Sequence, residues 1–127
     1  MNLINNKLIR QRILEKYNSK CAYCGCNLTI DTLSIDHIEP KFRHYSDKEL
    51  LSLNRIRGIC SPQNFNPSCK SCNSSKGTFT IEKWRIEIEL KHKRLLRDSS
   101  SYRLLFRYGL ITINNSVKFY FERIQNG

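Results

Sequence analysis

The chain has 127 residues and a mass of 15.0 kDa, which is enough for one compact domain and too little for two ordinary ones. Lys and Arg number 22 against 11 Asp and Glu, so the net charge is +11 and a polyanion such as nucleic acid is the natural partner. No apolar run is long enough to cross a membrane, and the first residues lack the apolar region of a signal peptide. We therefore expect a cytoplasmic protein that makes no membrane contact.

The excess positive charge lies mainly outside the middle of the chain. Residues 21–75 are almost neutral, whereas the segments before and after them are basic. This distribution predicts that the flanking segments contact a polyanion while the middle holds the chemistry. The alternative is that the Lys and Arg side chains only keep a small protein soluble.

Hydrophobic periodicity predicts a helix over residues 5–17 and a second helix over residues 80–97, capped by Thr80. Alternating apolar and polar residues predict a short strand over residues 32–38. Residues 41–58 are expected to form a long excursion between the two cysteine pairs, in which residues 47–53 are helical.

The tail predicts two further elements. Residues 101–108 are expected to form a short helix with Leu105 and Phe106 facing inward. Residues 110–113 and 117–121 alternate around an Asn-Asn pair and are expected to form a β-hairpin.

Four of the six cysteines form two Cys-x-x-Cys pairs, Cys21 with Cys24 and Cys69 with Cys72. Each pair can present two sulfurs to one ion, and four thiolates complete a tetrahedral structural zinc site. A disulfide framework is the alternative, but a reducing cytoplasm would open such bonds. The two remaining cysteines are expected to be small buried residues or bystanders, although either could replace a ligand: Cys26 and Cys60.

Polar residues suited to hydrolysis lie between the two cysteine pairs and just after them. Asp36 and His37 are adjacent on the expected strand, Asn64 comes shortly before the second pair, and Asn73 directly follows it. A carboxylate and a carboxamide oxygen suit a hard cation such as Mg²⁺, and an imidazole suits a general base. Because neighbouring strand residues point to opposite faces, Asp36 and His37 can serve one site only where the strand ends or bends.

A resemblance to the zinc-containing HNH endonucleases, also called ββα-metal or His-Me finger nucleases, rests on three segments in order: CAYC, SIDHIEP and NFNPSCKSCNSSKG. The tail resembles, more loosely, the C-terminal extension of small phage and bacterial HNH proteins. The resemblance implies an α+β fold with a ββα-metal core, clamped by the four-cysteine zinc site, with flanking helices and a C-terminal β-hairpin. It implies a single domain over 1–127, with an N-terminal helix in 1–20, the core in 21–77 and a basic helix and hairpin extension in 78–127.

The resemblance also implies a metal-dependent DNA endonuclease or nickase that hydrolyses phosphodiester bonds. His37 would be the general base, Asp36 and Asn73 would hold a catalytic Mg²⁺ or Mn²⁺, and Asn64 would steady the loop around the base. Asn66 competes with Asn64 for the last role, and Asn64 fits better by its distance from the second cysteine pair. Asn73 stands where the family often has His, which makes this an H-N-N variant and tilts the site toward Mg²⁺ or Mn²⁺.

Several basic residues are candidates for contact with DNA. Lys76 lies one helical turn beyond Asn73 and is the expected phosphate contact. Three further residues are candidate DNA contacts: Lys70, Arg43 and His44. Arg55 and Arg57 are expected to be surface charges, with contact to phosphates as the alternative. A homodimer and a larger phage or defence assembly both stay open as further partners.

The alternative function is a zinc-stabilised nucleic-acid-binding module without catalysis. Basic charge and two cysteine pairs predict binding alone. Such a module has no need for Asp36, His37 and Asn73 together, so these three residues discriminate between the two functions.

Overall fold

The computed structural model describes residues 3–114 and 116–125. The elements follow one another along the chain in this order: η1 (Leu3–Asn5), α1 (Lys7–Glu15), β1 (Ser34–His37), α2 (Asp47–Ser52), η2 (Pro62–Asn64), β2 (Phe65–Ser68), α3 (Lys70–Lys76), α4 (Ile81–Asp98), α5 (Ser100–Arg107) and α6 (Tyr120–Gln125). Mixed helices and a small sheet confirm the α+β class. Among the described residues, no helix combines the length and apolarity needed to cross a membrane.

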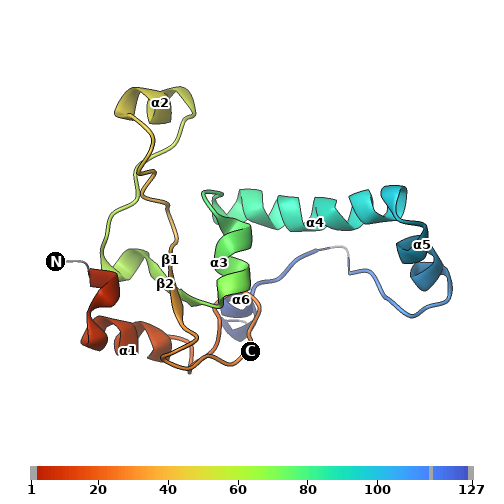
Figure 1. Ribbon diagram of the computed structural model, residues 1–127, viewed down its shortest axis with the longest axis horizontal. Coiled ribbons are helices and arrows are strands. Elements are labelled where there is room, and N and C mark those ends of the chain that lie inside the picture. The colour runs from red at the N-terminus through yellow and green to blue at the C-terminus, as the bar shows by residue number, and fades with distance from the viewer. Residues whose placement is uncertain (1–2, 115, 126–127) are drawn as a thin grey trace.

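Strands β1 and β2 form a two-stranded antiparallel sheet beside α3 (Figure 1). In the register, Asp36 lies opposite Asn66 and His37 lies opposite Phe65. All four residues of β2 are buried, and α3 starts two residues after β2, with Cys69 as its N-cap. The expected strand is therefore confirmed as β1, and its partner is the segment just before the second cysteine pair.

The excursion between β1 and β2 carries α2 and projects away from the sheet (Figure 1). A capping box formed by Ser46 and Glu49 starts α2, which confirms the helix expected there. The two sides of the excursion meet where Gly58 N–H donates to Pro40 O at 2.8 Å. A Cβ at position 58 would lie 1.7 Å from the backbone oxygen of Glu39, so only glycine allows this approach.

The core forms around the first cysteine pair. The ring of Trp84, from α4, stacks on Phe119 at 4.9 Å between centroids and meets Tyr23 edge-on at 5.1 Å. Leu14 from α1 and Leu33 before β1 are buried in the same cluster. Helix α4 starts at this core, as predicted from Thr80, and then runs away from the sheet to α5 (Figure 1).

The predicted C-terminal β-hairpin is wrong for the described residues, and Asn115 lies outside them. Residues 110–114 and 116–119 are in no strand, and α6 begins at Tyr120. The reason is competition for backbone hydrogen bonds: the N–H groups of Tyr120 and Phe121 donate to the carbonyls of Tyr23 and Ala22, both at 2.9 Å. The tail therefore forms backbone hydrogen bonds with the Cys21–Cys24 segment rather than between two strands of its own.

Helix α5 is present as expected, but the two apolar residues expected to face inward are exposed. Leu105 is 40% exposed and Phe106 is 44% exposed, because α5 lies at the far end of α4 (Figure 1). The expectation that these two residues face a core was wrong, since helical periodicity identifies an apolar face but not what covers it.

Candidate active site

The two cysteine pairs converge at the start of α3. The Sγ atoms of Cys21, Cys24, Cys69 and Cys72 all lie within 4.8 Å of one another, a cluster that can hold a metal ion such as zinc. Backbone N–H groups also face this cluster, since Cys69 N–H donates to Cys21 Sγ and Cys72 N–H donates to Cys69 Sγ, both at 3.4 Å. The tertiary structure thus assembles the four residues that the spacing singled out.

Electrostatics within the cluster favour a cation. Hydrogen bonding from Cys72 lowers the pKa of Cys21 to about 4, so Cys21 is readily a thiolate. The same hydrogen bond to Cys21 raises the pKa of Cys72, because a second thiolate beside the first is repelled. A bound cation removes that repulsion. The four-sulfur cluster does not include the two remaining cysteines. Cys60 is half-buried, whereas Cys26 is exposed rather than buried and its thiol lies beside Cys24 and Cys69.

Asp36 lies in the interior, with 3% of its surface exposed. Its Oδ2 accepts a hydrogen bond from the Tyr23 hydroxyl and lies 3.3 Å from the Lys76 ammonium. Burial raises the pKa of Asp36, and the Lys76 charge only partly offsets this effect. Burial also raises the pKa of Tyr23, so its hydroxyl stays protonated and is the donor to Asp36.

His37 ends β1 and packs edge-on against Phe65, with 5.0 Å between ring centroids. Its Nε2 is buried and has no hydrogen-bond partner among the described residues. Burial lowers the pKa of His37, and the nearby charges of Lys41 and Arg43 lower it further. The imidazole is therefore biased toward its neutral form, which can accept a proton.

A cavity of about 330 Å³ brings the distant candidates together. Asp36, His37 and Asn73 all line it, although Asn73 comes from α3 and the other two come from β1. Adjacent residues within a strand point to opposite faces, but His37 is the last residue of β1, where the chain turns into the excursion. Asp36 and His37 can therefore line the same cavity. The opposite wall belongs to that excursion and includes Lys41, Arg43 and His44.

Asn64 and Asn66 have different surroundings. Asn64 Oδ1 accepts from Glu39 N–H at 2.9 Å, and its Nδ2 donates to the carbonyls of Glu39 and Ile59, also at 2.9 Å. Asn64 thus ties together both sides of the excursion next to His37. Asn66 is buried behind the site, where its Oδ1 accepts from Lys16 Nζ at 2.9 Å. Of the two asparagines, Asn64 is therefore the one that bonds the backbone just after His37.

Lys76 is not where a phosphate contact would be. Its side chain has no exposed surface, and its Nζ donates to the carbonyls of His37 at 3.1 Å and Ile38 at 3.0 Å as well as facing Asp36. The expectation that Lys76 contacts DNA is corrected: helical spacing placed Lys76 on the face of Asn73, but that part of the face packs on β1. Lys70, by contrast, is exposed at the start of α3 and outside the residues that line the cavity.

The wall formed by residues 41–45 is organised by Arg57, which sequence reasoning had treated as a surface charge. The guanidinium donates to the carbonyls of Lys41, Phe42 and Tyr45 at 2.8–2.9 Å and also binds Asp47. Phe42 is held in the left-handed region at φ 54° with Arg55 stacked on its ring. No sequence signal for this arrangement exists beyond the arginines themselves, because the bonds go to backbone carbonyls.

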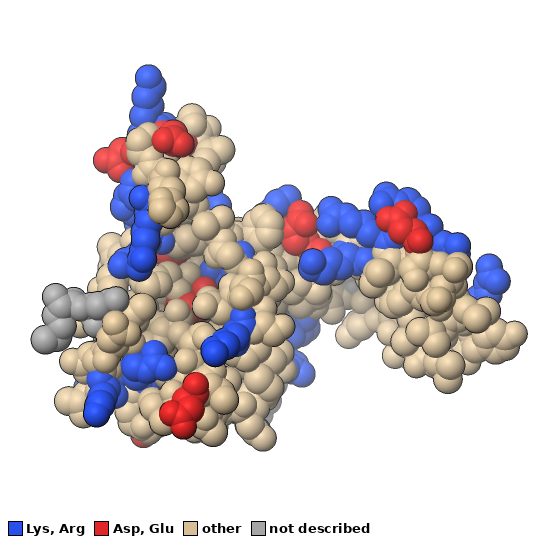
Figure 2. Space-filling view, viewed as in Figure 1, with Lys and Arg blue, Asp and Glu red and all other residues tan. Residues whose placement is uncertain are grey.

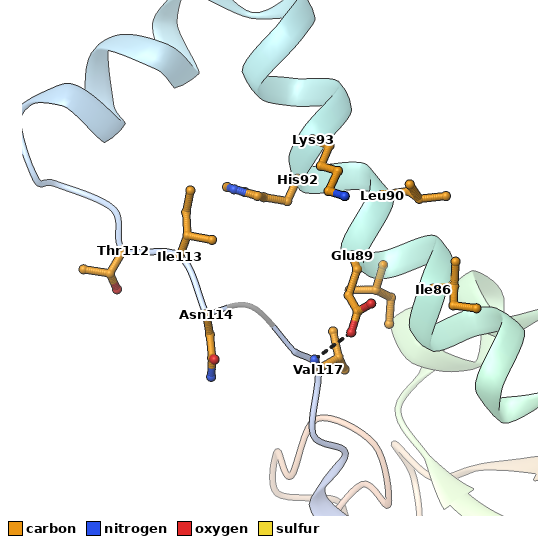
Figure 3. A pocket seen from close by; sticks show the side chains of 10 residues that line it. Ile86, Glu89, Leu90, His92, Lys93, Thr112, Ile113, Asn114 and Val117 are labelled. Atoms are coloured by element: carbon orange, nitrogen blue, oxygen red, sulfur yellow. Dashed lines mark hydrogen bonds between the residues drawn. The ribbon is translucent and has the colours of Figure 1, made fainter.

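A second cavity, of about 400 Å³, lies between α4 and the segment that carries Ile113 and Val117 (Figure 3). Glu89 accepts from Val117 N–H there at 3.0 Å, and His92 Nδ1 is 2.6 Å from the Tyr102 hydroxyl. Its lining shares no residue with the first cavity and is divided equally between apolar and polar side chains. Glu89, His92 and Asn114 bring a carboxylate, an imidazole and a carboxamide to this second cavity as well. The first cavity differs because its lining residues lie between the two cysteine pairs or shortly after them, where the sequence placed the candidate site.

Basic side chains cover both parts that project from the body. Figure 2 shows Lys and Arg over the excursion with α2 and along α4, with acidic residues interspersed. Three acidic residues on α4 form ion pairs with its own basic residues, as between Lys83 and Glu87 at 3.5 Å: Glu82, Glu87 and Asp98. The wall formed by residues 41–45 has no acidic residue, so its charge is unopposed within the segment.

Comparison with known proteins gives two curated relatives, and no family model matches the chain. The Septu protein PtuB of Bacillus thuringiensis is 34% identical over 77 residues, which are 59% of this chain and 26% of that protein. The "SPbeta prophage-derived putative HNH endonuclease YoqL" of Bacillus subtilis (strain 168) is 33% identical over 76 residues, which are 58% of this chain and 30% of that protein. The chain thus spans less than a third of the length of either relative.

Among solved structures, the Type II-C Cas9 enzyme from Actinomyces naeslundii matches with a TM-score of 0.48 and 25% identity, over 64% of this chain and 8% of that one. A structural match at this level carries no weight beside the sequence relatives. The relative named as a putative HNH endonuclease, together with the segments around the two cysteine pairs and Asp36–His37, supports an HNH-type family for this chain.

Proposed function

We propose that the protein is a metal-dependent nuclease that hydrolyses phosphodiester bonds of DNA, as an endonuclease or nickase. One observation carries this proposal: Asp36, His37 and Asn73, which are far apart in sequence, line one cavity with a basic opposite wall. The similarity to the relative named "SPbeta prophage-derived putative HNH endonuclease YoqL" supports the same reaction class.

The residues present fit a catalytic divalent ion. Asp36 offers a carboxylate, and the Asn73 side chain has no hydrogen bond among the described residues that would occupy its carboxamide oxygen. These are hard oxygen donors, which suit Mg²⁺ or Mn²⁺. When bound, such an ion would supply electrostatic stabilisation of the phosphate charge that develops during hydrolysis.

His37 is the proposed general base. The lowered pKa keeps its imidazole neutral near pH 7, so it can take a proton from the attacking water. Because Nε2 has no hydrogen-bond partner among residues 3–114 and 116–125, none of these residues competes for its lone pair or proton. Asn64 holds the backbone of Glu39, two residues beyond His37, and is proposed to fix the position of the base.

The wall of residues 41–45 is proposed to bind the phosphate backbone of the substrate. Lys41, Arg43 and His44 line the cavity opposite Asn73, and Arg57 holds their backbone in place. Contacts of this kind bind phosphates without reading bases. Lys70 is proposed to extend the same basic surface from the exposed start of α3.

Zinc at the four-cysteine cluster is proposed to have a structural role. The cluster joins the chain before β1 to the start of α3, so the bound ion would hold together the two elements that supply Asp36 and Asn73. A chain of this size has a modest core, and metal-linked folding can supply a large part of its stability.

The test is nicking of supercoiled plasmid DNA by the zinc-loaded protein with Mg²⁺, Mn²⁺, Zn²⁺ or EDTA. We expect cleavage with Mg²⁺ or Mn²⁺, none with EDTA, and a loss of about 10²–10⁴ in rate for His37→Ala with DNA binding retained. His92→Ala is the matched control, because His92 also has a buried unpartnered Nε2 but lines the other cavity. Full activity of His37→Ala would overturn the assignment.

One observation favours a second candidate, a zinc-stabilised nucleic-acid-binding module without catalysis. Both oxygens of Asp36 already lie close to Lys76, at 3.3 and 3.4 Å, as in a structural ion pair. For such a module we expect DNA binding that falls with salt but no strand scission with any of the metal ions. The plasmid assay therefore separates the two functions.

A further inference from the structure

A buried chain of polar side chains runs behind the Asp36 carboxylate. The Tyr23 hydroxyl donates to Asp36 Oδ2, and Asn66 Nδ2 donates to the Tyr23 hydroxyl at 3.3 Å. Lys16 Nζ donates to Asn66 Oδ1 at 2.9 Å. This series of hydrogen bonds begins at Lys16, the C-cap of α1, and passes through Asn66 in β2 and Tyr23 between Cys21 and Cys24 before it reaches β1.

Tyr23 lies inside the Cys-x-x-Cys segment, between two of the clustered sulfurs. While Cys21 and Cys24 contribute their Sγ atoms to the cluster, the Tyr23 ring packs edge-on against Trp84 and Phe119, at 5.1 and 5.6 Å. Tyr23 is 2% exposed, and its carbonyl accepts from Tyr120 N–H. The Tyr23 ring cannot rotate without disrupting the core packing. The position of its hydroxyl is therefore set by the Cys21–Cys24 backbone and by the core together.

The two partners of Asp36 constrain the carboxylate differently. Lys76 Nζ is nearly equidistant from the two oxygens, at 3.3 Å from Oδ2 and 3.4 Å from Oδ1, so it supplies charge but does not select a rotation of the carboxylate. The Tyr23 hydroxyl contacts Oδ2 alone. Tyr23 therefore supplies the contact that distinguishes the two oxygens.

We propose that Tyr23 is a positioning residue for the divalent-ion site, which it couples to the cysteine cluster by fixing the orientation of the Asp36 carboxylate. This inference rests on the proposed function, in which Asp36 is a ligand of the ion. Groups that orient metal ligands from behind typically change metal affinity or activity 10–100-fold when they are removed.

The test compares Tyr23→Phe, which keeps the ring and removes only the hydroxyl, with a control variant, Tyr102→Phe. The Tyr102 hydroxyl, on α5, is hydrogen-bonded to His92 on α4. For the zinc-loaded full chain, Mn²⁺ binding is measured by electron paramagnetic resonance without DNA, together with zinc content and thermal melting. We expect about tenfold weaker Mn²⁺ binding for Tyr23→Phe, with zinc content unchanged, and wild-type affinity for Tyr102→Phe. The Mg²⁺ concentration that half-saturates nicking should rise by a similar factor.

Asp36→Asn separates failure of this inference from failure of the proposed function. If Asp36→Asn leaves Mn²⁺ affinity unchanged, Asp36 is not a ligand and the proposed function is wrong at this residue. If Asp36→Asn weakens Mn²⁺ binding but Tyr23→Phe stays within twofold of wild type, the positioning role alone is refuted. Should Tyr23→Phe fail to fold, Asn66→Ala carries the same test, because it removes the hydrogen bond on the other side of the Tyr23 hydroxyl and should weaken Mn²⁺ binding in the same direction.

Discussion

Replacing Lys76 by methionine tests the buried ion pair with Asp36. The Lys76 and Asp36 side chains are 0% and 4% exposed, and Lys76 Nζ also bonds two backbone carbonyls. Lys76→Met keeps the length and apolar stem of the side chain but leaves the carboxylate and both carbonyls without their cation. Removing one partner of a buried pair costs about 3–5 kcal/mol of unfolding free energy, because the other charge stays buried and uncompensated.

The expected result for Lys76→Met is a fall in melting temperature of about 10–20 °C, given the few degrees per kcal/mol typical of domains of this size. Urea unfolding of the zinc-loaded protein can be followed by fluorescence of Trp84, the chain's single tryptophan, which is 2% exposed. Lys70→Met is the matched control on the same helix, where the side chain is exposed, and it should change stability by less than about 0.5 kcal/mol.

The double variant Lys76→Met with Asp36→Asn should recover most of the lost stability, since it removes the stranded charge along with its partner. The reasoning is refuted if Lys76→Met is as stable as Lys70→Met and instead binds DNA more weakly. That result would mean that Lys76 reaches the surface and contacts phosphate, as the helical spacing alone had predicted.

Three further changes have defined outcomes. Chelation of zinc, or Cys72→Ser, should unfold most of the protein, because structural zinc contributes about 10–16 kcal/mol, comparable to a whole domain's stability. Circular dichroism should show this loss, and Cys60→Ser, outside the cluster, should not cause it. Gly58→Ala should cost about 1–3 kcal/mol in urea unfolding, because the added Cβ meets the Glu39 backbone oxygen, and wild-type stability would show that the excursion opens freely. Arg57→Leu should speed chymotrypsin cleavage after Tyr45, since it removes the guanidinium that holds residues 41–45; an unchanged rate would mean that other contacts hold this wall.

The sequence by itself determined the features that depend on local spacing. Two Cys-x-x-Cys pairs predicted the four residues that cluster, because each pair can turn both sulfurs to one side within a few residues of backbone. The cap at Thr80 and the apolar periodicity predicted helices close to their observed bounds. The Asp-His segment and the Asn after the last cysteine were recognised from their order along the chain.

Only the tertiary structure decided which partner each polar group takes. Lys76 and Asn73 share a helical face, yet Lys76 is buried against β1 while Asn73 lines the cavity. Sequence spacing alone does not predict this difference. The tail bonds the carbonyls of Ala22 and Tyr23 instead of forming a hairpin, because backbone donors have no sequence signature for a distant acceptor. Tyr23 and Arg57 act on residues more than ten positions away, and such contacts exist only after the chain has closed around its cysteine cluster.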